Sequence, residues 1–253
     1  MKKIKMLLAL GTIALWGQQS FAHGGAEARV VIEPAVTSMA AGTNQYTFQI
    51  VDTSTNTVVG DSDLNISHEK KLHFIVYDPS LGEFQHVHPV FDGTNWNVDV
   101  QFVVNGNYWV WIQGELASDG TEFSSSTRLD VTKGTAALPA PPVLGDHRAG
   151  SVGTSSVEIG NSKIVAGKTV MLDLKMSRTD GSTPQLTPYL GAFAHIIATP
   201  ADGDELIHVH PMAKTATEGM IHASFPTAGD YRLWIQFMDA GILKTIPLSV
   251  TVY

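Results

Sequence analysis

The chain has 253 residues, a formal net charge of −8, 16% charged residues and no cysteine. Without cysteine it can form no disulfide and can offer no thiolate ligand to a metal. An acidic chain that lacks clusters of lysine and arginine is also a poor nucleic-acid binder, because the phosphate backbone is held through positive charge.

The first residues predict an export signal. Three lysines precede an apolar stretch over 6–16 that is too short to span a bilayer comfortably. Ser20-Phe21-Ala22 follows, with small residues at the two positions that a signal peptidase reads. We therefore expect residues 1–22 to be a signal peptide and the mature protein to be periplasmic or secreted. No other segment is long and apolar enough to be transmembrane, so no membrane span is expected after cleavage.

Cleavage after Ala22 would make His23 the first residue of the mature chain. A free α-amine and the imidazole of the same residue can chelate one copper ion. Gly24-Gly25 is flexible and would let this terminus reach a metal site. His23 is therefore a candidate ligand, although a frayed terminus without a role is the simpler interpretation.

Alternating apolar and polar residues predict β-strands along the rest of the chain, without convincing helical periodicity. Tyr46, Phe48 and Ile50 alternate with polar residues, as a half-buried strand requires. Further strands are predicted over 72–77, 96–102, 108–113, 170–176, 231–237 and 248–252. Turn signals separate them at Asp92-Gly93, Asn105-Gly106, Asp119-Gly120, Asp180-Gly181 and Asp202-Gly203.

A first histidine triad consists of His73, His86 and His88, the last two within an H-V-H-P motif. Side chains at i and i+2 of a strand share a face. If residues 78–83 form a hairpin loop and Tyr77 pairs with Phe84, His73 lies opposite His88. All three imidazoles then share one face, and the apolar residues between them enter the core. A slip of one residue would place His73 on the wrong face.

The pattern occurs twice. His195, His208 and His210 repeat the spacing of the first triad at an offset of 122 residues, again with H-V-H-P. The motif G-x-Y-x-x-W-I-Q also recurs, over 106–113 and 229–236. Two copies of one domain are therefore expected, at 23–133 and 151–253, joined by a proline-containing linker over 134–150. In the recurring motif, we expect the tyrosines to act as strand-corner residues and Trp111 and Trp234 to lie in the cores.

Strands and turns at these spacings predict an all-β protein of two tandem antiparallel β-sandwiches, immunoglobulin-like or cupredoxin-like. Imidazole is the commonest side-chain ligand of transition metals, so each triad predicts a metal site, one per domain. Copper is preferred by the Irving–Williams order and by a cysteine-free exported chain, with zinc as the alternative. Met212 could serve Cu(I). His68, His147 and His222 have no counterpart in the other copy and are interpreted as surface residues.

The histidine pattern resembles a group of exported bacterial sandwich-domain proteins with an H-x-H-P signature, loosely associated with copper and heavy-metal handling. The residues that match are His73, Phe84, His86, His88, Pro89, Gly106 and Tyr108, and in the second copy His195, His208, His210, Pro211, Gly229 and Tyr231. A weaker similarity is to CopC-type periplasmic copper-resistance proteins, whose mature chain starts with histidine. This chain is twice as long and lacks a clear Asp-x-His motif.

Three functions compete. The first is an exported metal carrier or buffer, with a metal ion as its ligand and a periplasmic delivery or efflux protein as its partner. The second is a structural or adhesive tandem sandwich whose histidines only support the fold. The third is a copper redox enzyme that uses His23. No G-x-S-x-G or H-E-x-x-H motif is present, which argues against a hydrolase, so a protein that is not an enzyme is expected.

Overall fold

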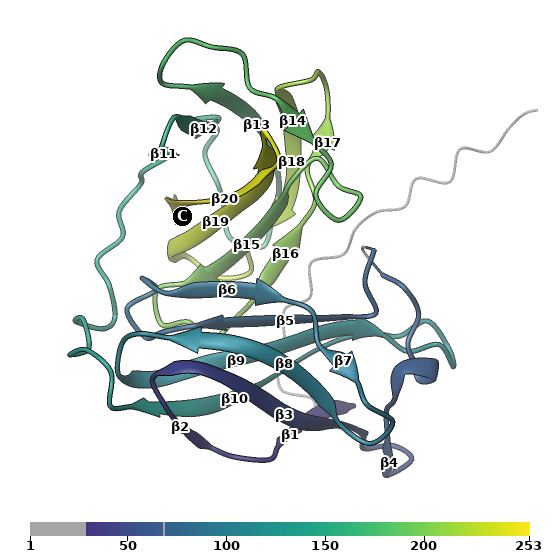
Figure 1. The fold of residues 1–253 in the computed structure, drawn as a ribbon. Helices are drawn as coiled ribbons and strands as arrows, with labels where there is room; N and C mark the ends of the chain where they lie inside the picture. Colours follow the sequence, from purple (N-terminus) through teal and green to yellow (C-terminus); the bar gives the residue numbers. More distant parts are fainter. Residues whose placement is uncertain (1–28, 68) are drawn as a thin grey trace, which may run out of the picture.

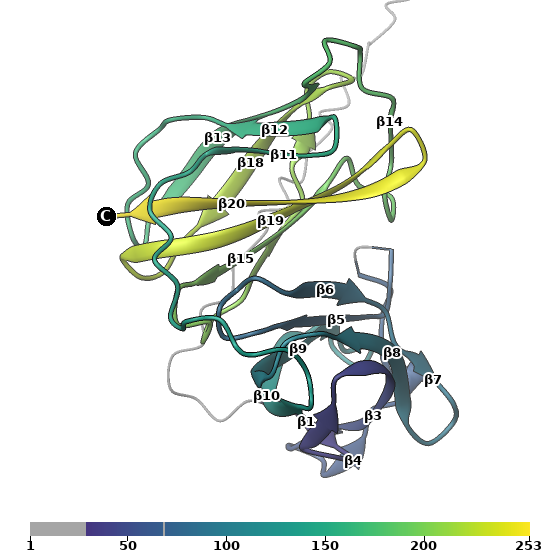
Figure 2. The same cartoon turned by 60° about the vertical axis from the view of Figure 1, so that its left-hand side comes forward.

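A computed structural model of the chain describes residues 29–67 and 69–253. The predicted signal peptide, His23 and His68 lie outside these residues. Two β-sandwiches stack on each other, the first below and the second above in Figure 1, with a turned view in Figure 2. The fold class predicted from the sequence is confirmed. No helix within the described residues is long and apolar enough to cross a membrane.

The first sandwich contains strands β1 to β10. One sheet has the order β1-β3-β8-β7, with β4 paired to β3; these are Val30–Pro34, Gly42–Asp52, Trp96–Phe102, Val90–Phe91 and Thr57–Val58. The other has the order β2-β10-β9-β5-β6; these are Ser38–Ala40, Glu122–Thr132, Gly106–Glu115, Leu72–Tyr77 and Phe84–Val87. A 3-10 turn lies at Asp61–Asp63.

The second sandwich repeats this plan with strands β11 to β20. One sheet has the order β11-β12-β13-β18-β17; these are Ala149–Val152, Ser155–Ile159, Thr169–Arg178, Glu218–Ser224 and Met212–Ala213. The other has the order β14-β19-β15-β16, with β20 paired to β19; these are Leu186–Thr187, Gly229–Asp239, His195–Pro200, Ile207–Val209 and Ile242–Val252. Strands β5, β6 and β9 therefore correspond to β15, β16 and β19.

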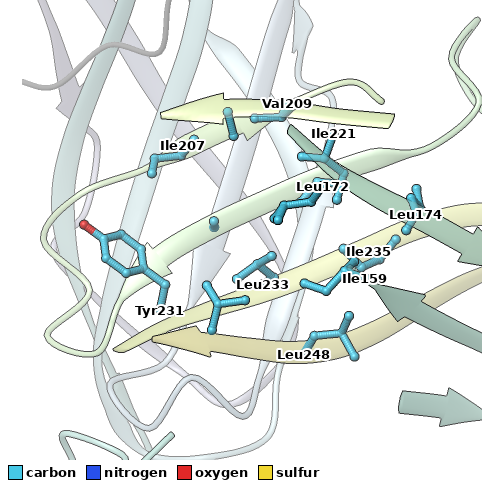
Figure 3. Close-up of a cluster of buried hydrophobic side chains, with 14 of the residues drawn as sticks. Ile159, Leu172, Leu174, Ile207, Val209, Ile221, Tyr231, Leu233, Ile235 and Leu248 are labelled. Atoms are coloured by element: carbon cyan, nitrogen blue, oxygen red, sulfur yellow. The ribbon is translucent and has the colours of Figure 1, made fainter. Parts of the chain in front are cut away.

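Each sandwich encloses its own apolar core, because alternate residues of each long strand point between the two sheets. In β13, buried Val170, Leu172, Leu174 and Met176 alternate with exposed neighbours. Figure 3 shows how Leu172 and Leu174 meet Leu233 and Ile235 of the opposite sheet. In the first sandwich Tyr46, Phe48 and Phe74 pack with ring centroids 5.6–5.8 Å apart.

Several sequence predictions are confirmed in detail. The predicted strands over 72–77 and 96–102 coincide with β5 and β8. The two repeated tyrosines act as strand-corner residues: the Oη atoms of Tyr108 and Tyr231 donate to the carbonyls of Val104 and Thr227, at 2.9 and 3.2 Å. The prediction of wholly antiparallel sheets is inexact, because β2 pairs with β10 in parallel. The first half of β20, around Pro247, was not predicted.

Strands β5 and β15 are buried along their whole length. One face of each enters a sandwich core, and the other face packs against the opposite sandwich. The boundary holds an apolar cluster that we call the interface cluster: Ile75, Tyr77, Leu81, Trp111, Leu144, Ile197, Leu206 and Trp234. Trp111 and Trp234 are buried core residues, as expected, but their core is this interface cluster and not the interior of either sandwich. In β9, Tyr108 and Val110 point inward, so Trp111 between Val110 and Ile112 points out to the second sandwich.

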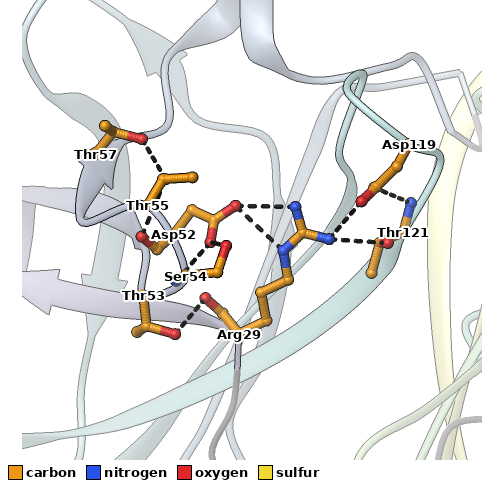
Figure 4. A network of polar contacts seen from close by, with 8 residues as sticks. All are labelled: Arg29, Asp52, Thr53, Ser54, Thr55, Thr57, Asp119 and Thr121. Carbon is orange, nitrogen blue, oxygen red and sulfur yellow. Dashed lines mark hydrogen bonds and ion pairs between the residues drawn. The ribbon is translucent and has the colours of Figure 1, made fainter.

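Further contacts join the two sandwiches and hold the start of β1. Tyr77 Oη donates to the carbonyl of Gly203 at 2.8 Å and lies 3.2 Å from Thr199 Oγ1 of the second sandwich. Phe84 stacks on Trp234 with centroids 4.4 Å apart. At the far end of the first sandwich, Arg29 bridges Asp52 at 3.1 Å and Asp119 at 2.6 Å (Figure 4). This ties the start of β1 to the β9–β10 loop.

The segment over 134–150 holds to both sandwiches at its ends. Thr135 forms an isolated parallel bridge with Val104 of the first sandwich. Leu144 is buried in the interface cluster, and its carbonyl accepts from Ser249 Oγ at 3.2 Å. Between these points Leu138 and Val143 are exposed.

Candidate metal centre

The two histidine triads face each other across the boundary between the sandwiches. His73 on β5 and His86 on β6 meet His195 on β15 and His208 on β16. Between the sandwiches, the ring centroids of His208 lie 5.2 Å from His73 and 5.3 Å from His86, and those of His86 and His195 are 5.7 Å apart. The sequence predicted a separate triad for each domain. In the structure the two triads form one cluster.

Strand register explains how each triad shares one face. Tyr77 pairs with Phe84 and Phe74 with Val87, as assumed from the sequence, which sets His73 opposite His88 one step further on. Ile196 pairs with Val209, so His195 stands in the same relation to His210. These faces point outward from their own sandwich, but they are not open to solvent. His73, His86 and His195 are 2%, 4% and 0% exposed, because the opposite sandwich covers them.

In the second triad three ring nitrogens lie at the corners of a small triangle. Nε2 of His210 lies 2.8 Å from Nδ1 of His195 and 3.2 Å from Nε2 of His208, and the third edge is 3.3 Å. Around a tetrahedral ion at metal–nitrogen distances of 2.0–2.1 Å, ligand nitrogens lie about 3.3 Å apart. The triangle is therefore close to the size that three imidazoles adopt around one zinc or copper ion.

The first triad is more open. Nδ1 of His73 and Nε2 of His86 are 3.0 Å apart. His88 lies beside both, with ring centroids 5.1 Å from each. Its Nε2 is buried and has no hydrogen-bond partner among the described residues. A buried polar atom without a partner is costly, so this nitrogen is suited to a ligand that the protein alone does not supply.

The other ring nitrogens of four histidines are held by oxygen acceptors. Nε2 of His73 lies 3.1 Å from the carbonyl of Ser67, and Nε2 of His195 lies 2.9 Å from that of Tyr189. Because a carbonyl oxygen only accepts, these nitrogens carry the hydrogen in the neutral rings. The Nδ1 atom of each ring therefore carries a lone pair, and both lone pairs point into the cluster.

For His86 and His208 the acceptors are glutamines of the opposite sandwich. Nδ1 of His86 lies 2.9 Å from Oε1 of Gln236, and Nδ1 of His208 lies 3.2 Å from Oε1 of Gln113. The amide of Gln236 is oriented by its Nε2 donating to Thr245 Oγ1 at 3.0 Å. Each sandwich thus fixes the tautomer of a histidine in the other and turns its Nε2 lone pair inward.

These two glutamines were not predicted from the sequence, although the sequence held a signal for them. Each is the last residue of the repeated G-x-Y-x-x-W-I-Q motif, which was interpreted as determining only the fold. Gln113 lies two residues after Trp111 on the same face of β9 and pairs in register with His73. Gln236 pairs in the same way with His195. The alternation of the motif sets the face of each glutamine, and the pairing of β9 with β5 and of β19 with β15 places it beside the first histidine of its triad.

Burial keeps His86, His88 and His208 neutral. Desolvation, followed by the neighbouring histidines, holds the pKa of His86 and of His208 well below the usual value of 6.5. Desolvation, with a contribution from Lys70, lowers the pKa of His88 to about 4. Neutral imidazole is the form that ligates metal.

Within residues 29–67 and 69–253, two groups of three nitrogens could hold an ion: His73 with His86 and His208, and His195 with His208 and His210. The ligand nitrogens of each group lie within 4.8 Å of one another. Both groups include His208, and the first group draws on both sandwiches. His147 and His222 lie elsewhere and are exposed. His23 falls outside the described residues.

Comparison with known proteins gives the chain little context. Residues 150–253 match a family described as "Domain of unknown function (DUF8832)". No curated protein matches the chain. One similar solved structure is FdeC, an Escherichia coli adhesin, at 14% identity and a TM-score of 0.28. The match covers 90% of this chain, which spans 65% of the adhesin chain.

Another similar structure is that of the fibronectin(III)-like modules of Clostridium thermocellum CbhA, at 13% identity and a TM-score of 0.25. That match covers 88% of this chain and 93% of the other. Similarity this low carries no information on ligand or activity.

Proposed function

We propose that the protein binds a transition-metal ion between its two sandwiches and serves as an exported metal carrier or buffer. The observation that carries this proposal is the convergence of lone pairs. Nδ1 of His73 and His195 and Nε2 of His86 and His208 point into one cluster, while their other nitrogens donate to oxygens. Nδ1 of His73 and Nε2 of His86 lie 3.0 Å apart, close enough for both to ligate one ion.

Copper is the preferred ion and zinc the alternative. Both accept several imidazoles, and the Irving–Williams order places copper above zinc for a given set of nitrogen ligands. The histidine–oxygen contacts behind the ligands are the arrangement that orients metal-binding imidazoles in proteins. Resemblance to exported H-x-H-P proteins supports copper handling, and a periplasmic delivery or efflux protein is the partner that such a carrier would need.

The direct test is metal binding by the full mature chain without an affinity tag. We expect calorimetric titration with Zn(II) or Cu(II) to reveal a tight site in the native protein. His86→Ala together with His208→Ala removes one ligand from each sandwich and should abolish that site. His147→Ala is the matched control, because His147 is exposed and belongs to neither three-nitrogen group. Absence of a tight site in the native chain would overturn the proposal.

A structural or adhesive tandem sandwich remains the second candidate. It is favoured by the hydrogen bonds that join the histidines to Ser67, Tyr189, Gln113 and Gln236, since such bonds can brace an interface without metal. Under this alternative, treatment with a chelator leaves the thermal midpoint of the purified protein unchanged. Under the metal proposal, chelation lowers the midpoint, because an ion that binds only the folded state stabilises it.

A further inference from the structure

Away from the histidine cluster, one sheet face collects soft ligand atoms. The described residues contain six methionines, and three of them, Met171, Met212 and Met220, lie on the outer face of the sheet that contains β13, β18 and β17. Met171 is 62% exposed and Met212 is 64% exposed. An exposed methionine is not unusual by itself, but three on adjacent strands form a local concentration of thioethers.

Strand register places these residues side by side. Met212 of β17 pairs with Met220 of β18. His222 lies two residues after Met220 on β18 and therefore on the same face. It pairs with Met171 of β13. Their chain neighbours Gly219, Ile221 and Leu172 are buried on the other face. Cross-strand partners have Cβ atoms about 4.5–5.5 Å apart, so the flexible methionine side chains can bring their sulfurs together beside the imidazole.

This face also carries charged residues: Asp173, and at its far end Lys175 and Glu218, which pair in register. Asp173, which pairs with Met220 in β13, forms an ion pair with Lys214 at 2.6 Å. The uncharged donors at the centre of the face are three thioethers and one imidazole. Thioether sulfur is a soft ligand that selects Cu(I) over hard divalent ions. This ligand set differs in kind from the all-imidazole cluster between the sandwiches.

We propose that Met171, Met212, Met220 and His222 form a surface site for a soft monovalent cation, Cu(I) or Ag(I). Met212 lies two residues beyond His210 of the histidine cluster. An ion held on this face is therefore placed close along the chain to the proposed buried centre. The surface site uses none of the six clustered histidines, so it stands whether or not the proposed function holds.

The test uses Ag(I), which is redox-inert, and the full mature chain labelled with ¹³C at the methionine ε-methyl groups. The protein is first saturated with Zn(II) to fill the histidine centre. We expect the Met171, Met212 and Met220 methyl resonances to shift together and to saturate at a single equivalent of Ag(I). Met39 and Met238 lie elsewhere and are internal controls.

Substitution then assigns the ligands. Met171→Leu, Met212→Leu and Met220→Leu together should weaken Ag(I) binding by more than about tenfold and leave Zn(II) binding unchanged. The fold should survive, because leucine conserves the volume of methionine. The matched control, Met39→Leu with Met238→Leu, should bind Ag(I) as the native protein does.

Two results would overturn the surface site: methyl resonances that shift one by one over different Ag(I) ranges, or unchanged Ag(I) affinity in the triple variant. Failure of the first step, with no Zn(II) bound, counts against the proposed function alone. The same Ag(I) titration of the metal-free chain still reports on the methionine face.

Discussion

Oε1 of Gln236 accepts a hydrogen bond from Nδ1 of His86 at 2.9 Å, across the boundary between the two sandwiches. Gln113 makes the reciprocal contact to His208 at 3.2 Å. The two sandwiches thus contact each other reciprocally: each supplies the histidine whose tautomer the other fixes. Metal affinity and docking of the sandwiches are expected to depend on the same residues.

Replacement of these glutamines should weaken metal binding without removing a ligand. In Gln236→Leu, Nδ1 of His86 loses its acceptor, and the tautomer that presents Nε2 to the cluster is no longer favoured. Loss of such an outer contact typically lowers metal affinity by about 10–100-fold. Calorimetric titration with Zn(II) measures the change. Gln45→Leu, on the exposed part of β3, is the control, and equal affinities in the two variants would contradict a role for Gln236 in orienting His86.

The stoichiometry should reflect the shared ligand His208. The sequence predicted two independent ions, one for each triad. In the structure both three-nitrogen groups use His208, whose Nδ1 is engaged by Gln113 and whose Nε2 carries a single lone pair. We therefore expect one tight ion and a second that binds more weakly. His208→Ala should remove the tight site, and His73→Ala should leave a site at His195, His208 and His210.

Substitutions in the two triads should also have non-additive effects on Zn(II) affinity. Residues in contact or in one network show coupling energies of about 0.5–3 kcal/mol. A double-mutant cycle of His86→Ala and His208→Ala, read out as Zn(II) affinity, measures this coupling. Two equal ions in the native chain, with additive effects of the substitutions, would restore the prediction of independent sites.

Acid should destabilise the metal-free protein. The folded state keeps His86, His88 and His208 neutral, with the pKa of His88 lowered to about 4. In the unfolded chain the same groups protonate near pH 6.5, so below that value the unfolded state binds more protons. Stability is therefore complete above about pH 6.5 and falls as the pH drops toward the folded pKa, by about 1.4 kcal/mol per pH unit for each such histidine.

Urea unfolding of the metal-free chain between about pH 7.5 and pH 4.5 measures this slope. His88→Gln should flatten it, because one neutral histidine is removed, whereas His147→Ala should not change it. Unfolding free energies that stay constant over this range would show that the cluster takes up protons without cost in the folded state.

The sequence predicted the strands and the local register of the triads well, because period-two alternation and hairpin pairing are local properties. The pairing of β5 with β6, with Tyr77 opposite Phe84, follows from residues within about one hairpin. The joint cluster did not follow, because it depends on how two complete sandwiches dock. Ile75 and Trp111 look like ordinary strand residues, and only the partner surface of Ile197 and Trp234 makes their outer face a buried one.

Gly203 offers a way to disturb this docking without touching a histidine. It has φ +77°, and a Cβ there would lie 2.5 Å from Nε1 of Trp109 in the other sandwich. Gly181 has φ +78° in a similar Asp-Gly turn of the same sandwich, and a Cβ there would meet nothing within 4 Å. Gly203→Ala and Gly181→Ala therefore share the strain of a left-handed alanine, about 1–2 kcal/mol, and differ only in the clash across the interface.

We expect Gly203→Ala to cost a further 1–3 kcal/mol or so from overpacking and to weaken Zn(II) binding, because His86 and His208 depend on glutamines of the opposite sandwich. Gly181→Ala should lose stability alone and keep its affinity for Zn(II). Urea unfolding and Zn(II) titration of the two variants, side by side, separate the effects. If both variants bind Zn(II) as the native chain does while Gly203→Ala is the less stable, the centre tolerates a shift of the sandwiches, and the coupling of metal affinity to docking is wrong.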